Sequence, residues 1–123
     1  MSAQLYGPVV AEHAKNPRNR GALEAPDIAH EDTNPLCGDR IAFELKLSAG
    51  VIGAARFRGE ACMVALAAAS VLTELVQGLT LAEAAALPDE KLLDALAARL
   101  RPSRIGCATL PLTVLRRGIA QAR

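Results

Sequence analysis

The stretch RIAFELKLSAGVIGAARFRG, residues 40–59, carries the clearest structural pattern in this chain. Its large apolar side chains recur at every second position, at Ile41, Phe43, Leu45 and Leu47. This period of two predicts a strand with one buried face. Ala49-Gly50 predicts a turn, and residues 51–58 predict the returning strand. The stretch is therefore interpreted as a β-hairpin.

Beyond the hairpin, the pattern is helical to the end of the chain. Residues 62–76 are apolar almost all round, which predicts a central, buried helix that ends at Gly78. Thr80 and Glu83 form a capping-box pattern that opens a short helix to about Leu87. Pro88 then suits the first turn of another helix, whose end lies near Arg99.

The last helix is expected to follow a loop at residues 101–106, with Pro111 tolerated only in its first turn. Before the hairpin, residues 3–15 predict a short helix, and residues 16–36 predict mostly loop with an edge strand near 26–31. Strands followed by helices indicate an α+β fold, in which helices pack on a small three-stranded antiparallel sheet.

The composition restricts the classes of function. The chain has 123 residues, enough for one domain over 1–123, and a net charge of +1. This balance offers no electrostatic attraction for nucleic acid or an acidic membrane, and no apolar run is long enough to span one. Three cysteines, an odd number, make a disulfide framework improbable and favour a reducing cytoplasm.

Cys37 and Asp39 lie in the turn-rich segment just before the hairpin and could ligate one metal ion. Asp39 could instead bind local backbone N–H groups or pair with Arg40. Cys62 is expected at the mouth of the buried helix, where a thiolate is favoured, although a free cysteine is equally well a small buried apolar residue.

Cys107 follows a loop that carries Arg101 and Arg104 and is expected just before the final helix. Cationic neighbours and a helix start both lower the pKa of a thiol, so Cys107 is the best candidate for a sulfur-accepting group. Arg104 could also be an ordinary solvated charge. His13 and His30 could complete a metal site in place of Asp39, although surface or core-edge positions are the commoner outcome.

No C-x-x-C pair, G-x-S-x-G elbow, P-loop or dinucleotide fingerprint occurs. The chain nevertheless resembles the iron–sulfur cluster assembly proteins of the IscU/NifU N-terminal type, with the SufU-like branch nearest. Five blocks in the family order carry this resemblance, at residues 13–19, 34–40, 57–62, 72–78 and 104–110.

The resemblance implies a metal or cluster site with Cys37, Asp39, Cys62 and Cys107 as ligands. It also implies sulfur transfer from a cysteine desulfurase to Cys107 or Cys37, with Arg104 as a partner-binding residue. IscU-type members use such a site as a scaffold for a [2Fe–2S] cluster, built from iron and delivered to downstream apo iron–sulfur proteins or carriers. SufU-type members hold zinc there and relay sulfur as persulfide, in effect as sulfurtransferases. A purely structural metal is the third alternative.

The chain departs from both branches. Gly106 stands where IscU-type members have a histidine, and the insertion that SufU-type members carry before the third cysteine is missing. Residues 100–104 only partly resemble the chaperone-binding segment of IscU-type proteins. Ala61 and Ala65 replace a usual glycine and a usual serine.

Overall fold

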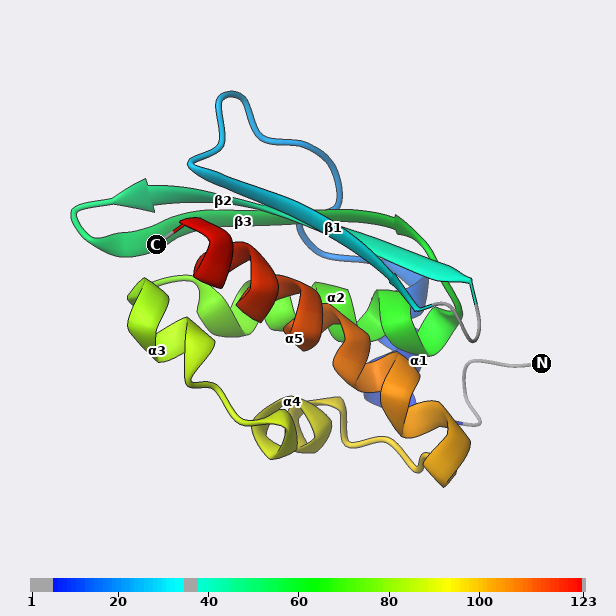
Figure 1. Ribbon diagram of the computed structural model, residues 1–123. Helices are drawn as coiled ribbons and strands as arrows, with labels where there is room; N and C mark the ends of the chain where they lie inside the picture. Colours follow the sequence, from blue (N-terminus) through cyan, green and yellow to red (C-terminus); the bar gives the residue numbers. More distant parts are fainter. Residues whose placement is uncertain (1–5, 35–37, 123) are drawn as a thin grey trace.

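The computed structural model describes residues 6–34 and 38–122 of the chain (Figure 1). Three strands form one antiparallel sheet in the order β1 (Ile28–Asn34), β2 (Asp39–Ser48) and β3 (Val51–Glu60). The helices of the described ranges are α1 (Pro8–Lys15), α2 (Met63–Val76), α3 (Leu81–Ala85), α4 (Asp89–Leu96) and α5 (Pro102–Ala122). The predicted α+β fold with a three-stranded antiparallel sheet is confirmed.

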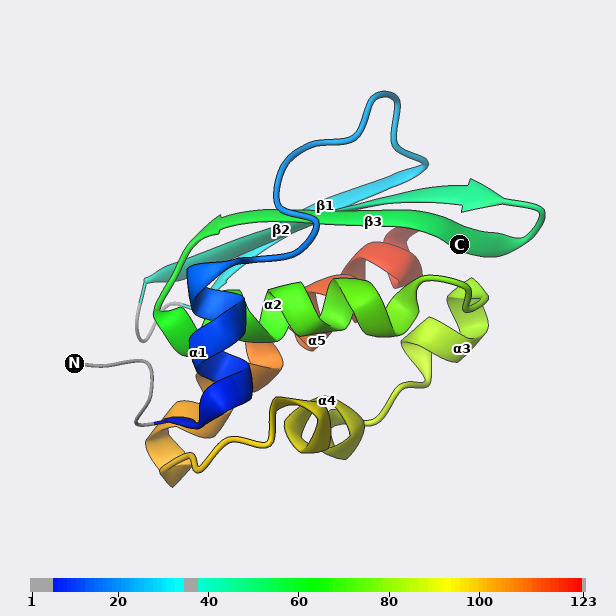
Figure 2. The same ribbon diagram turned by 180° about the vertical axis from the view of Figure 1, so that it is seen from behind.

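The helices gather on one face of the sheet, with α2 and α5 nearest to it (Figures 1 and 2). The segment between α1 and β1 runs over the opposite face and is held there by a buried carboxylate. Glu44 Oε1 accepts the Leu23 N–H at 2.6 Å, and its Oε2 accepts from Arg58 at 3.2 Å. Because both oxygens are paired, the charge of Glu44 is accommodated under this segment.

The predicted hairpin is confirmed and has a two-residue turn. Ala49 and Gly50 have φ values of 53° and 84°, so both lie in the left-handed region. Two such residues in a row make the tight turn whose twist suits the flanking strands. β2 and β3 pair in register, apart from an irregularity between Lys46 and Leu47.

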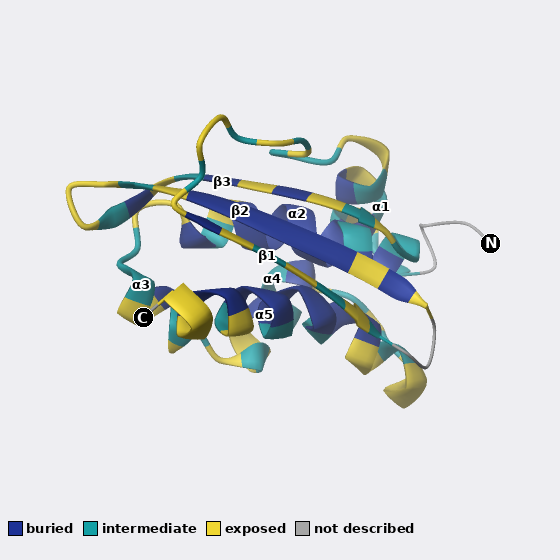
Figure 3. Ribbon diagram, turned by 45° about the horizontal axis from the view of Figure 1, so that its top comes forward, coloured by how far each residue is buried: buried dark blue, intermediate teal, exposed yellow. Residues whose placement is uncertain are grey.

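The core lies between the sheet and the two helices α2 and α5. In the central part of β2, consecutive residues are buried, so both faces of this strand are covered (Figure 3). Phe43 and Phe57 lie in this core at paired positions of β2 and β3, with ring centroids 6.5 Å apart. α2 is rich in alanine, whose small side chain lets neighbouring elements approach closely. The predicted central, buried helix is thus confirmed, with four fully buried alanines at Ala65, Ala67, Ala68 and Ala69.

The prediction for the start of the last helix is wrong. Residues 102–106 are helical, so α5 begins at Pro102 and Pro111 lies well beyond its first turn. Pro102 is suited to a helix start, since its ring presets φ and its missing N–H would have no partner there. Pro111 has no N–H to bond the Cys107 carbonyl, a defect that costs about 3 kcal/mol in an isolated helix. Burial of the α5 face that contains Leu112 and Leu115 offsets this cost.

Other predicted elements differ at their boundaries. The expected edge strand near 26–31 is β1 over 28–34, because pairing with β2 continues as far as Asn34 opposite Asp39. The capping box at Thr80 is confirmed, with both of its hydrogen bonds to Glu83 present. α4 ends at Leu96 and is capped by Ala97, which has a φ of 48°, so Arg99 lies beyond the helix. Among the described residues, no helix is both long and apolar enough to cross a membrane.

Candidate metal centre

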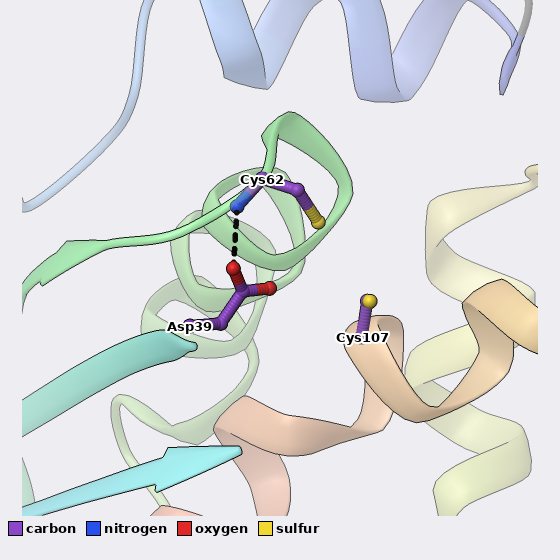
Figure 4. Close-up of side chains that lie close together, drawn as sticks. All are labelled: Asp39, Cys62 and Cys107. Carbon is purple, nitrogen blue, oxygen red and sulfur yellow. Dashed lines mark hydrogen bonds between the residues drawn. The ribbon is translucent and has the colours of Figure 1, made fainter. Parts of the chain in front are cut away.

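Three of the predicted site residues meet at one end of the sheet. Asp39 is the first residue of β2, Cys62 immediately precedes α2, and Cys107 lies in the second turn of α5. One carboxylate oxygen and the two sulfur atoms all lie within 4.8 Å of one another (Figure 4). The side chains thus converge from three different elements. Cys37, the fourth predicted ligand, lies outside the described residues.

Asp39 is buried, with only 8% of its surface exposed, and its two oxygens have different surroundings. Oδ1 accepts the backbone N–H of Cys62 at 3.2 Å (Figure 4). Oδ2 is buried and has no hydrogen-bond partner among the described residues. Leaving a buried carboxylate oxygen unpaired costs about 1–3 kcal/mol or more, and a bound cation would remove that cost.

Cys62 occupies the N-cap position of α2, as predicted, with an extended backbone at φ −65° and ψ 162°. Its side chain makes no capping hydrogen bond and points instead toward Cys107 (Figure 4). The positive end of the α2 dipole therefore lies beside the sulfur atom and the Asp39 carboxylate. The start of α2 thus brings both groups of the candidate site side by side.

Cys107 is 5% exposed and lies inside α5, so the expectation that it precedes the helix is wrong. Arg104 lies one helical turn before it, at the border of the site. Its hydrogen bond with the Cys107 side chain, followed by attraction to Tyr6 and Cys62, raises the pKa of Arg104 above its usual value. Arg104 is thus the cation beside the candidate ligands, rather than a charge isolated in solvent.

Tyr6 also lies near this group, since it interacts electrostatically with Arg104. Sequence reasoning did not single it out. It is the only tyrosine of the chain, but no local pattern connects it to cysteines that come much later. Only the tertiary structure brings Tyr6 and Arg104 together.

Both histidines have their own partners away from the described ligand group. His13 Nδ1 lies 2.7 Å from Ser70 Oγ, and His30 Nε2 lies 2.8 Å from Asp32 Oδ2. Within the described part of the chain, the group able to hold a metal consists of Asp39, Cys62 and Cys107, without either imidazole. The core-edge interpretation of the histidines is confirmed.

The donor set suits a thiophilic metal ion. Zinc binds thiolate at about 2.3 Å and carboxylate at about 2.0–2.2 Å, so tetrahedral donors lie roughly 3.3–3.8 Å apart. The described donors lie within 4.8 Å of one another, so a small contraction would bring them to that geometry. Together with the unpaired Asp39 oxygen, this arrangement fits zinc or the iron of an iron–sulfur cluster.

Comparison with known proteins supports the same interpretation. Residues 5–123 match the model of the NifU-like N terminal domain. The zinc-dependent sulfurtransferase SufU of Bacillus subtilis is 34% identical over 95% of this chain and 90% of its own length. The scaffold protein IscU of Azotobacter vinelandii is 36% identical over 85% of this chain and 84% of its own length.

A similarity of fold extends to solved structures. FiSufU, a protein of the SUF system from Fervidobacterium islandicum AW-1, superimposes with a TM-score of 0.79. The match covers 97% of this chain and 99% of that one at 20% identity, which shows the fold alone. With the family match over nearly its whole length, the chain belongs to the NifU-like N-terminal domain family.

Proposed function

We propose that this protein assembles iron–sulfur clusters, and that it accepts sulfur from a cysteine desulfurase at a site formed by Cys37, Asp39, Cys62 and Cys107. The observation that carries the proposal is the convergence of two thiols on the buried Asp39 carboxylate, whose Oδ2 has no hydrogen-bond partner within the described ranges. The relatives named for scaffold and sulfurtransferase roles give it further support. The cargo in this proposal is a [2Fe–2S] cluster, which then passes to apo iron–sulfur proteins or carriers.

Sulfur acceptance requires a thiolate that is held ready and then released. Zinc, when bound, keeps its cysteine ligands deprotonated. The Cys107 or Cys37 thiolate attacks the terminal sulfur of the desulfurase persulfide, and the desulfurase cysteine leaves as a thiolate with the bonding electron pair. The product is a persulfide on this chain, with no net oxidation or reduction.

The position of Arg104 supports Cys107 as the sulfur acceptor. It also supports this end of the sheet as the place where the desulfurase docks. Its guanidinium lies beside the Cys107 side chain and is partly accessible from solvent. In this proposal it contacts the desulfurase while the persulfide approaches. The odd number of cysteines is consistent with a reducing compartment such as the cytoplasm.

A second candidate function is a zinc-dependent sulfur relay without cluster assembly. The specific observation in its favour is the Arg104-to-Cys107 contact one helical turn apart, together with the 34% identical zinc-dependent relative. In that case the persulfide is passed on directly, and no cluster forms on this chain.

Anaerobic purification with metal analysis and an absorption spectrum separates the two candidates. A scaffold supplied with the desulfurase, cysteine and ferrous iron gives a brown product with visible absorption bands. A relay stays colourless, retains zinc and increases sulfide release by the desulfurase. Both are contradicted if Cys107→Ser and Cys37→Ser each keep the fold and still form the brown product and stimulate the desulfurase as well as the exposed control Ser103→Ala does, since the metal would then be structural.

Asp39 has a separate predicted role in the exchange of metal or cluster at the site. A carboxylate is a harder and more weakly held ligand for a thiophilic metal than a thiolate, so it gives the site an easy point of entry. We therefore expect Asp39→Ala to retain metal or cluster longer and to transfer sulfur more slowly. Chelator-competition rates and desulfurase assays measure the two effects. Loss of metal with unchanged transfer would show that Asp39 does not have this role.

A further inference from the structure

The two described thiols of the site face each other across the space between α2 and α5 (Figure 4). Their Sγ atoms lie within 4.8 Å of one another, and neither cysteine is in a disulfide. A disulfide has an S–S length of about 2.05 Å, with β-carbons about 3.8 Å apart. Rotation of one side chain with a small backbone shift would therefore close the bond.

The local backbone allows such a shift. Cys62 is the N-cap of α2, so its own φ and ψ are extended rather than helical, although its carbonyl accepts the Leu66 N–H at 3.0 Å and its N–H donates to Asp39. Cys107 follows Gly106, and an added β-carbon at Gly106 would meet nothing within 4 Å. The α5 segment beside Cys107 is therefore not tightly enclosed on that side.

We propose that the metal-free protein forms a Cys62–Cys107 disulfide, which makes the site a redox switch that bound metal keeps open. The regulatory meaning of this switch rests on the proposed function, because it governs whether the site can be loaded. Formation of the bond itself does not depend on that function.

The different exposure of the two cysteines determines the order of events. Cys62 is partly exposed, whereas Cys107 is buried, so a small disulfide such as oxidised glutathione reaches Cys62 first. The Cys62 thiolate attacks one glutathione sulfur and displaces the other as a thiolate. The Cys107 thiolate then attacks the Cys62 sulfur and displaces the second glutathione thiolate. The two cysteine sulfurs lose two electrons, the oxidant gains them, and the two cysteine protons pass to the released thiolates or to solvent.

The bond would switch off metal binding reversibly. Metals bind thiolates, and a disulfide sulfur has no thiolate charge to donate. The oxidised site would therefore lose two of its soft donors at once. A dithiol reductant should restore both.

The test uses the full chain after chelator treatment, exposed to oxidised glutathione. We expect the intact mass to fall by two hydrogen atoms and the peptide map to contain a Cys62–Cys107 link. Linked peptides that contain Cys37 in place of either residue would overturn the proposal. So would a chain that carries only glutathione adducts.

Paired variants test the order of attack, and far-ultraviolet circular dichroism checks the fold of each. Cys107→Ser should accumulate glutathione on Cys62, since the second thiol is missing. Cys62→Ser should be modified at Cys107 at least about tenfold more slowly, because that thiol is buried. Cys37→Ser should form the link as the unaltered chain does. Equal rates of glutathione modification at Cys62 and Cys107, or loss of the link in a folded Cys37→Ser, would overturn the mechanism. If a variant does not fold, the peptide map of the unaltered chain decides.

A metal readout separates this proposal from the proposed function. Zinc added before the oxidant should prevent the link, and the linked chain should not bind zinc until it is reduced. If zinc gives no protection, the switch is wrong even when the reduced protein stimulates the desulfurase. If the link and its protection are both found but no stimulation occurs, the proposed function is wrong and the disulfide stands.

Discussion

Ser70, on α2, is fully buried, and its hydroxyl group connects α2 to α1 and to the loop that follows α1. Its Oγ accepts the Arg18 backbone N–H at 2.7 Å and lies 2.7 Å from His13 Nδ1. Nearby, Asn19 Nδ2 donates to Thr73 Oγ1 at 3.1 Å. The 13–19 block that sequence reasoning assigned to a family resemblance thus has a physical role, since it fastens α1 and the following loop to α2.

The His13 ring should make stability depend on pH. Burial, followed by repulsion from Arg18, lowers the pKa of His13 below its usual value, although Glu74 and Glu12 act in the opposite direction. A proton therefore binds the unfolded chain more readily than the folded one. The contribution is fully present above the unfolded pKa of about 6.5 and is lost as the pH falls below it.

Urea denaturation at about pH 7.5 and about pH 5.5 measures this effect. We expect the metal-free chain to lose more stability over this interval than His13→Gln does, because glutamine cannot take up a proton. Glu24→Gln removes an exposed carboxyl that is not among the groups acting on the His13 pKa; it is the control and should behave like the unaltered chain. An identical loss in His13→Gln would show that other groups cause the pH dependence.

At the scale of elements, the contact between β1 and α5 is unusually close. A β-carbon added at Gly118 of α5 would lie 2.8 Å from His30 Cβ on β1. The same two elements are linked by Asp32, whose Oδ2 lies 3.2 Å from an Arg117 nitrogen. Burial opposes ionisation of Asp32, but hydrogen bonds from His30 and Arg117 outweigh it and lower the pKa of that carboxyl. Packing and charge therefore hold α5 against the edge strand.

Two glycines of α5 provide a matched test of this packing. Gly118→Ala should destabilise the fold by about 1–3 kcal/mol, because the added methyl group forces β1 and α5 apart. Gly106→Ala should stabilise it by roughly 0.5–1 kcal/mol, since alanine favours helix and the new β-carbon meets nothing within 4 Å. Urea denaturation gives both values. A gain in stability for Gly118→Ala would show that β1 and α5 separate easily.

For the whole molecule, the candidate site connects the start of β2 with the starts of α2 and α5. A metal ion bound there would fasten the sheet to both of the helices that cover it. Because only the folded chain brings these donors together, binding should add stability by mass action.

We therefore expect zinc to raise the melting temperature of the reduced, chelator-treated chain. An excess of free zinc of about 100 times its dissociation constant corresponds to about 2.7 kcal/mol. Cys107→Ser should lose most of this shift, whereas Ser103→Ala should keep it. Scanning calorimetry with and without zinc measures it. Equal shifts in both variants would indicate zinc binding away from the candidate site.

Local patterns were enough for several elements. The period of two in β2, the all-round apolar pattern of α2 and the Thr80 capping box each predicted an element that the structure contains. In each case the information lies within a few neighbouring residues, because side-chain period and cap hydrogen bonds act over one or two turns. The start of α5 was not predicted from such local patterns, because Pro111 suggested that the helix begins close to it. The burial that outweighs the hydrogen bond missing at Pro111 comes from residues far away in the sequence.

By itself, the sequence determined the candidate ligands: three cysteines and an aspartate, each in a context suited to a ligand. Only the tertiary structure decided that Asp39, Cys62 and Cys107 lie within 4.8 Å of one another, with Arg104 at the border of the group. The physical reason is that these residues belong to a strand and two helices with no local coupling between them. Their meeting depends on how α2 and α5 pack on the sheet, and that packing is a sum of contacts spread over the whole core.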